Sequence, residues 1–192
     1  MARQVQFRSS LFLCLLFAAC TGGQQLVAIP DFYVPETNFL LKQKEGYLYY
    51  KNERFSGRVY ELYPNGDTAL LIPYCNGKEE GCLRRWYAHG KKVEERFYTQ
   101  GKKEGQHKGW WPDGKIRFEY YFVNDEHEEE AREWYSNGSL YRSFHYKKGQ
   151  EEGLQQMWWE DGKLRANYVV KDGEQYGLIG RKLCKNLNDE KK

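Results

Sequence analysis

The chain has 192 residues, of which 30 are basic and 27 are acidic, giving a formal net charge of +3. Residues 1–19 contain two of the basic residues and no acidic one, so the rest of the chain carries 28 minus 27, or +1. Because proteins that bind nucleic acid carry basic patches, a body this close to neutral argues against nucleic acid as a partner.

The first 19 residues have the pattern of an export signal. Arg3 and Arg8 supply positive charge, and a short apolar run follows from residue 11 to residue 19. This run is too short to span about 30 Å of hydrocarbon. The sequence LFAAC, residues 16–20, resembles a bacterial lipobox, which implies cleavage before Cys20 and lipidation of its thiol; the alternative is an ordinary secretory signal with an incidental cysteine. Because two or three acyl chains hold a protein on a membrane, we expect a lipid-anchored protein of the bacterial cell envelope.

The rest of the chain divides into three segments. Residues 20–45, which include Pro30 and Pro35, predict a lipid anchor and tether. Residues 46–184 predict one β-repeat domain, and its first segment, GYLYYKNERFSG at 46–57, has the pattern of a half unit that starts the array. Residues 185–192 predict a charged, frayed tail.

A spacing of 24 residues organises the repeat domain. Glycine occupies 14 of 16 positions in three series with this spacing, where average usage near 7% would place about one. The two exceptions are Asp125 and Glu129. Two adjacent aromatic columns share the spacing: Trp86, Trp110, Trp134 and Trp158, and Tyr63, Tyr87, Trp111, Tyr135 and Trp159. A fixed period of this length predicts a repeat architecture with one structural unit per period.

Each unit contains two turn signals separated by aromatic-rich runs. Asn65-Gly66 and its equivalents predict two-residue type I′ hairpins, and Asn76-Gly77 and its equivalents predict the reversal into the next unit. The runs between them are about eight residues long and rich in Tyr, Trp, Phe and Val, which favours strands. We therefore expect an all-β fold, namely a single-layer antiparallel β-hairpin repeat array of about eleven strands without a helix over either face.

Pairing across the Asn65-Gly66 turn assigns the side chains to faces. Residue 63 then opposes residue 68, which places positions 59, 61, 63, 68, 70, 72 and 74 on one face. In later units this face would include Trp111 with Ile116 and Trp159 with Leu164. The opposite face supplies the candidate binding surface: Trp86, Trp110, Trp134, Trp158, Arg84, Lys108 and Arg132. Two interpretations stay open, namely rings that stack to hold a single-layer sheet together and rings exposed for a partner.

The two cysteines Cys75 and Cys82 flank the turn NGKEEG. An exported chain lies where disulfides persist, so the pair is a candidate disulfide. Closing so short a loop would stabilise the fold by about 2.5 kcal/mol. The alternative is two free thiols.

The segment DEHEEE, residues 125–130, departs most from the repeat. Its carboxylates form a candidate acidic contact loop for a basic partner: Asp125, Glu126, Glu128, Glu129 and Glu130. The alternatives are a solvated loop and a site for a divalent cation.

The sequence lacks the motifs of catalysis. It contains no GxSxG, Walker loop, HExxH or CxxC. His89, His107 and His145 lie in different columns without ligand spacing, which argues against zinc. We therefore expect a protein that is not an enzyme and that needs neither cofactor nor metal.

The pattern GxxxxWYxNGKLxxxxxYxxGxxxG resembles the variant MORN repeat of bacterial proteins often described as YwqK-type antitoxins. The match is carried by Gly81, Trp86, Tyr87, Gly90, Lys91, Tyr98, Gly101 and Gly105 and their equivalents in the other units. The resemblance implies a β-hairpin array that binds partners without catalysis. We expect a lipoprotein that presents this array to an unknown protein at the cell envelope; the alternatives are an antitoxin or immunity-type protein and a glycan-binding surface protein.

Overall fold

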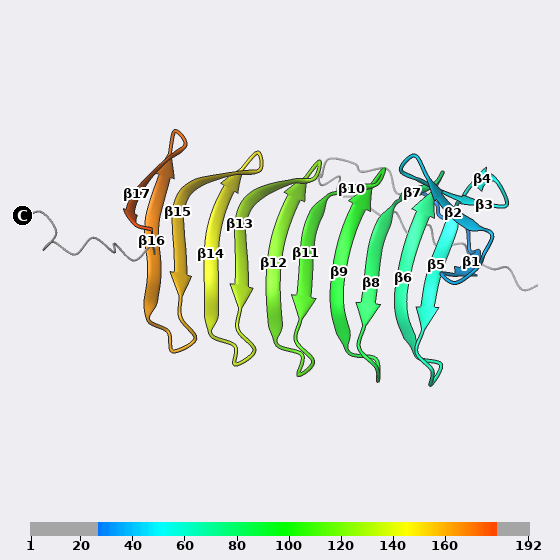
Figure 1. Cartoon of the computed structure of the whole chain (residues 1–192), viewed down its shortest axis with the longest axis horizontal. Coiled ribbons are helices and arrows are strands. Elements are labelled where there is room, and N and C mark those ends of the chain that lie inside the picture. Colours follow the sequence, from blue (N-terminus) through cyan, green and yellow to red (C-terminus); the bar gives the residue numbers. More distant parts are fainter. Residues whose placement is uncertain (1–26, 180–192) are drawn as a thin grey trace, which may run out of the picture.

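The computed structural model describes residues 27–179, and these residues form strands and turns without a helix (Figure 1). No helical segment in this range could cross a membrane. The predicted fold is confirmed: the molecule is all-β, and its main sheet is a row of hairpins that follow one another in chain order.

Within residues 27–179, the larger of two sheets contains eleven strands in sequence, each antiparallel to the next. They are β5 (Gly57–Leu62), β6 (Thr68–Cys75), β8 (Gly81–Trp86), β9 (Lys92–Thr99), β11 (Gly105–Trp110), β12 (Ile116–Val123), β13 (Glu126–Trp134), β14 (Leu140–Lys147), β15 (Gln150–Trp158), β16 (Leu164–Lys171) and β17 (Glu174–Leu178). Short strands β1 (Tyr33–Pro35), β7 (Lys78–Glu79) and β10 (Lys102–Lys103) complete this sheet. We number the repeat units one to five, beginning at residues 57, 81, 105, 129 and 153.

The N-terminal segment is more ordered than the sequence predicted. Strand β1 pairs in parallel with β5, and β2 (Leu41–Lys44), β3 (Tyr47–Tyr50) and β4 (Glu53–Arg54) form a separate small sheet. Residues 33–44 therefore contain strands where a tether was predicted. The end of the segment 46–57 holds the first type I′ turn, because Phe55 O accepts the Gly77 N–H and Ser56 Oγ accepts the Asn76 N–H. Burial explains the difference, because this segment closes a core cluster formed by Val34, Leu48, Phe55 and Val59.

Two-residue type I′ turns connect each unit to the next. In the first of them, Asn76 and Gly77 have φ of 49° and 79°, and Cys75 pairs with Lys78 on either side. The other four follow the same pattern, with both central residues at positive φ. They comprise residues 100–101, 124–125, 148–149 and 172–173.

The turns within the units are three residues long, which corrects the predicted type I′ turn at Asn65-Gly66. The Tyr63 N–H donates to Asp67 O, and the Gly66 N–H donates to Tyr63 O, so residues 64–66 form the loop and only Gly66 has positive φ. The Asn65 side chain instead accepts a hydrogen bond from the Asp67 N–H at 3.1 Å. Pro64 is the signal that favoured this turn, since proline suits the second position of a type I turn.

A β-bulge beside each three-residue turn moves the pairing by one residue. Leu62 pairs with Thr68, whereas Glu61 pairs with Leu70, so Ala69 is the extra residue. The bulge recurs in every unit, and its extra residues are Ala69, Val93, Arg117, Tyr141 and Arg165.

The bulges leave the strand bodies in the predicted register. Beyond each bulge the pairs agree with the assigned faces, for example Val59 with Ile72. At the turn ends the prediction was wrong, because Ile116 and Leu164 pair with Trp110 and Trp158. We call the face with the tryptophan column the tryptophan face and the opposite one the core face. Buried residues of the core face include Val59, Leu70, Leu83, Phe118, Phe122, Phe144, Ala166, Tyr168 and Val170.

Periodic hydrogen bonds join successive units at the edge with the three-residue turns. The Tyr63 hydroxyl donates to Trp86 O at 2.8 Å, which links unit one to unit two. The same bond recurs from Tyr87 to Trp110 O, from Trp111 to Trp134 O and from Tyr135 to Trp158 O. The second aromatic column is therefore a series of hydrogen-bond donors, which a sequence pattern of aromatic residues does not reveal.

The opposite edge has its own periodic bond. Glu80 accepts a hydrogen bond from the Gln100 N–H at 2.8 Å, and Glu104 accepts one from Asn124. Glu128 does the same for Lys148 at 2.6 Å. The carboxylates that precede units two, three and four therefore hold the next type I′ turn in place, and the Ser56 hydroxyl does the same for Asn76.

The two residues that replace glycine, Asp125 and Glu129, keep the positive φ of the glycines at equivalent positions. Asp125 has φ of 73°, and its amide and carboxylate form reciprocal hydrogen bonds with the backbone of Lys103. Glu129 has φ of 61°. A side chain at positive φ costs of the order of 1 kcal/mol, and Asp125 offsets that cost with its carboxylate bond, whereas no such bond involves Glu129 among residues 27–179.

Glu129→Gly is expected to raise the free energy of unfolding by about 1 kcal/mol, because it removes the positive-φ strain. Asp125→Gly is the matched control and is expected to bring no gain, since it also removes the bond to Lys103. Urea unfolding followed by tryptophan fluorescence measures both. Equal increases in the free energy of unfolding would show that the carboxylate bond of Asp125 does not offset its backbone strain.

Candidate binding surfaces

The structure brings the predicted surface together on the tryptophan face. Trp86, Trp110, Trp134 and Trp158 are all partly buried and lie at equivalent positions. Residues one unit apart are separated by two strands, or roughly 10 Å, which exceeds the 4.5–7 Å of stacked rings. No two of these four rings stack, so ring stacking within the column does not hold the sheet together.

The basic residues of this surface are already paired. Arg84 contacts Glu95 at 3.2 Å, and Lys108 contacts Glu119 at 3.1 Å. Arg132 forms an ion pair with Glu130. These residues alternate in charge across adjacent strands, so the tryptophan face offers little unbalanced charge to a partner.

An open groove of about 580 Å³ lies at the N-terminal end of the tryptophan face. Trp86, Tyr60 and Leu71 form its apolar floor, while Tyr33 of β1 and Asp67 line it as well. The Asp67 carboxylate accepts hydrogen bonds from the Asn65 side chain and from the His89 N–H. Flat aromatic rings beside a carboxylate are suited to a sugar ring or to a proline-containing segment.

A second groove, of about 620 Å³, lies on the core face across units three to five, and Arg96 of unit two lines it as well. Five aromatic residues of the core face line it, namely Trp111, Phe118, Tyr120, Tyr135 and Tyr141, and Trp134 of the tryptophan column lines it as well. Phe118 stacks on Tyr120 with ring centroids 4.6 Å apart, and Tyr135 meets Tyr141 edge-on at 5.1 Å. We call this groove and the adjoining Arg165 the aromatic–arginine groove.

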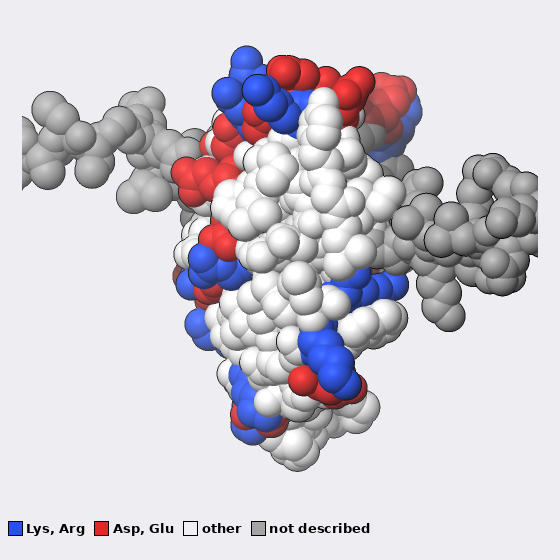
Figure 2. Space-filling view, turned by 90° about the vertical axis from the view of Figure 1, so that its left-hand side faces the viewer, with Lys and Arg blue, Asp and Glu red and all other residues white. Residues whose placement is uncertain are grey.

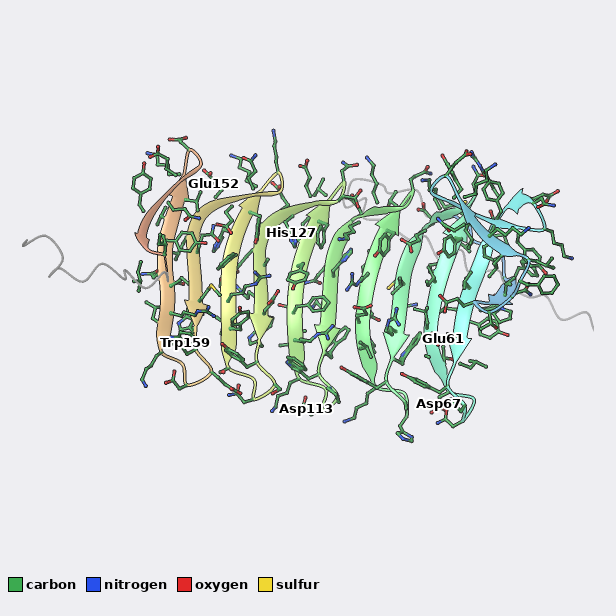
Figure 3. All side chains as sticks on the ribbon, in the orientation of Figure 1. Glu61, Asp67, Asp113, His127, Glu152 and Trp159 are labelled. Atoms are coloured by element: carbon green, nitrogen blue, oxygen red, sulfur yellow. The ribbon has the colours of Figure 1, made fainter. Side chains whose placement is uncertain are left out.

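The bulges position Arg117 in this groove and Arg165 next to the Trp159 ring. The guanidinium of Arg117 lies 5.7 Å from the Trp111 ring, and that of Arg165 lies 4.5 Å from the Trp159 ring. Figure 3 shows Trp159 and Asp113 at the edge with the three-residue turns. Within residues 27–179 neither arginine forms an ion pair or a side-chain hydrogen bond.

The other charged groups in the groove are mostly paired. Arg96 contacts Glu94 at 2.8 Å, and Glu133 contacts Arg142 at 2.6 Å. Burial and the carboxylate of Glu133 raise the pKa of Tyr120, so this hydroxyl remains a donor at neutral pH. Glu160 also lines the groove. The groove and Arg165 therefore combine two unpaired guanidinium groups with the paired carboxylate of Glu133, the carboxylate of Glu160 and an aromatic wall.

The predicted acidic loop is divided among several structural roles. Only Asp125 lies in the turn, and the four glutamates belong to strand β13. Glu128 accepts the Lys148 N–H, as described above, and Glu130 contacts Arg132 and Ser143. Burial opposes ionisation of Glu130, but these partners hold its pKa below the ordinary value. Glu126 and Glu129 alone remain exposed without such partners in the described part of the chain, so the segment is not one contact surface.

The predicted disulfide is not formed, and both thiols are free. Cys75 pairs with Lys78 across the type I′ turn, whereas Cys82 pairs with Phe97 of β9. The chain enters a new strand at Gly81, so the two cysteines belong to different strand pairings. Burial raises the pKa of Cys82, which disfavours its thiolate.

An aromatic series on the core face includes two histidines. His107 lies 4.7 Å from the Phe122 ring, and His127 lies 4.2 Å from the same ring and 4.9 Å from Tyr146. His107 is 1% exposed, and its Nε2 lies 2.8 Å from Phe97 O. Burial, together with nearby Arg96 and Lys103, lowers the pKa of His107. Burial, Lys103 and Arg142 lower the pKa of His127.

Acid is expected to destabilise this part of the sheet. Because the pKa of His107 is lower in the folded state, the unfolded chain binds the proton first as pH falls below about 6.5. The free energy of unfolding should therefore decrease from pH 7 to pH 5. His107→Gln is expected to reduce this decrease, since Gln155 occupies the equivalent position in unit five. The urea midpoints of the wild type and His107→Gln at pH 7 and pH 5 test this expectation, and His89→Gln, in an exposed turn, is the control. If the free energy of unfolding of His107→Gln decreased with pH as much as that of the wild type, His107 would not be the cause of the acid sensitivity.

Within the described range, no group of three or more His, Cys, Asp or Glu side chains could hold a metal ion. The predicted lipidation site, Cys20, and the tail at 185–192 lie outside the described residues. Sequence reasoning missed Arg117, Tyr141 and Arg165 because they stand at bulges. Their shared spacing of 24 residues, next to the turn that contains Pro112 in unit three, was the available signal.

Comparison with known proteins identifies the repeat. The sequence matches no curated protein. Three segments match the family described as the MORN repeat variant, at residues 103–124, 130–148 and 151–172. These segments coincide with the units that carry the aromatic–arginine groove. Between residues 103 and 172 the chain is therefore similar to variant MORN repeats.

Proposed function

We propose that the chain is a non-catalytic binding module that presents its MORN-type array to a protein partner. The observation that carries this proposal is the aromatic–arginine groove, in which aromatic rings and the unpaired Arg117 line an open channel and the unpaired Arg165 lies beside the Trp159 ring. Arginine and aromatic side chains supply most of the binding energy in many protein interfaces. Neither a cofactor nor a metal is needed for this role.

Site-specific photocrosslinking in intact cells tests the proposal. A photoreactive phenylalanine analogue at Tyr141, inside the groove, is expected to crosslink to a discrete protein. The same analogue at Tyr121, an exposed residue outside this groove, is the control. Crosslinks of equal yield from both positions, or none from Tyr141, would overturn the assignment of the groove as the binding surface.

Anchoring at the cell envelope forms part of the proposal. The lipobox-like segment before Cys20 supports it, and two or three acyl chains would hold the array at a bacterial membrane. A Cys20→Ser variant is expected to leave the membrane fraction and to lose palmitate labelling. Retention of that variant on the membrane would overturn the lipid anchor.

The captured protein also decides between a scaffold and an immunity-type role. If the array neutralises a toxin, the crosslinked partner should be toxic when expressed alone and harmless when co-expressed with this chain. A scaffold protein would show no such rescue.

Glycan binding is a second candidate, and the N-terminal groove favours it. Trp86, Tyr60 and Asp67 place two aromatic rings beside a carboxylate, the arrangement that sugar rings require. Titration with envelope polysaccharide should quench tryptophan fluorescence in the wild type and not in Trp86→Ala. Equal quenching in Trp158→Ala, at the other end of the tryptophan face, would count against a specific site.

A further inference from the structure

The two unpaired arginines of the aromatic–arginine groove have a fixed separation. Arg117 and Arg165 occupy equivalent bulges two units apart, which corresponds to four strands. At about 4.8 Å per strand, the two positions lie roughly 19 Å apart along the sheet. An extended polypeptide advances about 3.3 Å per residue, so this distance matches about six residues.

Both guanidinium groups have donors available for a carboxylate. The Trp111 and Trp159 rings lie beside the two groups, and the guanidinium N–H donors form no hydrogen bond within residues 27–179. A planar guanidinium presents these donors in the geometry that a carboxylate accepts. Lys115 and Lys163, two residues before the arginines, are different because each contacts an aspartate of its own turn, at 3.1 Å and 2.8 Å.

The surface between the arginines is suited to an uncharged segment. Tyr135 and Tyr141 meet edge-on there, and the Tyr135 hydroxyl is already used by Trp158 O. Glu160 lines the same stretch, so a third carboxylate on the ligand would be repelled there. Aromatic or proline side chains would cover the two rings without that penalty.

We propose that the groove binds an extended polypeptide segment with two carboxylates about six residues apart. This inference rests on the proposed function. One carboxylate pairs with Arg117 and the other with Arg165, and aromatic or proline residues between them lie on Tyr135 and Tyr141. Positions six residues apart point to the same side of an extended chain, so both carboxylates face the sheet together.

Selection from a random peptide library tests this inference on the full chain. Nine-residue peptides are displayed, panned on the wild-type protein, and the enriched peptides are titrated by fluorescence polarisation. We expect enrichment of Asp or Glu pairs six residues apart with Tyr, Trp, Phe or Pro between them. Arg117→Gln/Arg165→Gln should weaken binding at least about tenfold, because two charge-assisted contacts are lost.

Lys115→Gln/Lys163→Gln is the matched control, since it removes the same charge from the same two turns. We expect less than about a twofold loss. Equal losses in the two double variants would show general attraction between opposite charges and would overturn the inference. Enriched peptides without paired carboxylates would overturn it as well, and so would the absence of any enrichment. Crosslinking at Tyr141 is a separate measurement of protein binding. A discrete crosslink there would still support the proposed function if the peptide selection contradicted this inference.

Discussion

Gly109→Ala is expected to lower the free energy of unfolding by about 3 kcal/mol, measured by urea denaturation. A Cβ atom at this position would lie 2.2 Å from the ring of Phe118, which rests on the backbone of the paired strand. The ring is buried and stacks on Tyr120, so it has little room to move. The backbone of Gly109 is not in the positive-φ region, and the expected loss is therefore steric.

Phe118→Leu provides the control for that steric origin. A smaller side chain leaves room for the added methyl group, so Gly109→Ala should cost much less in the Phe118→Leu background than in the wild type. Additive losses would contradict a clash between the two residues. This double-mutant cycle also tests the packing of the groove wall, because Phe118 forms part of that wall.

Gln155→Met is expected to lower the free energy of unfolding by about 2–4 kcal/mol, because it leaves two buried backbone groups unpaired. Gln155 is 0% exposed, and its side chain accepts the His145 N–H at 3.0 Å and donates to His145 O at 2.9 Å. This side chain fills an irregularity between β14 and β15, where the strand pairing shifts. Thermal unfolding followed by circular dichroism measures the loss.

Gln156→Met is the matched control one residue further along the same strand. Its amide contacts Asn167 at 3.2 Å on the tryptophan face, in an exposed bond, so the same replacement should cost less than about 0.5 kcal/mol. Similar losses in both variants would contradict the role of Gln155 as a substitute for backbone pairing.

The sequence predicted the array well because its signals are local. A two-residue turn with both residues at positive φ selects dipeptides such as Asn76-Gly77, and these recur with the period of the fold. The N-terminal segment could not be predicted in this way. Its strand β1 pairs with β5 through contacts between residues 33–35 and 58–60, and no local pattern encodes such a pairing.

The internal turns show where a strong local signal remains ambiguous. Asn-Gly and Asp-Gly suit both a type I′ turn and a three-residue turn in which the first residue caps the loop with its side chain. Asp113 does the latter, with its carboxylate accepting the Lys115 N–H at 3.0 Å. The choice between the two turns also decides which side chains stand at the bulge, and this is why the arginine pair escaped prediction.

The candidate site was predicted only in part. The tryptophan column does share a face, because the strand bodies keep the expected register. Its flanking basic residues, however, are neutralised across the strands, as Arg84 is by Glu95. The bulge position does recur every 24 residues, but it holds arginine only at Arg117 and Arg165, so the spacing marks the position without marking a binding residue.

The bonds from Tyr63, Tyr87, Trp111 and Tyr135 to the following tryptophan carbonyls all point in one direction along the chain. Each hairpin is therefore secured by the one after it, while the first is also covered by the N-terminal core cluster. Trp159, the last of the column, is 50% exposed, and Figure 2 shows an uncharged surface over much of that end of the sheet. Opening of the array should consequently begin in unit five and proceed toward unit one. Amide hydrogen exchange would show this as protection that increases from β16 back to β5, with the aromatic–arginine groove in the more readily opened half.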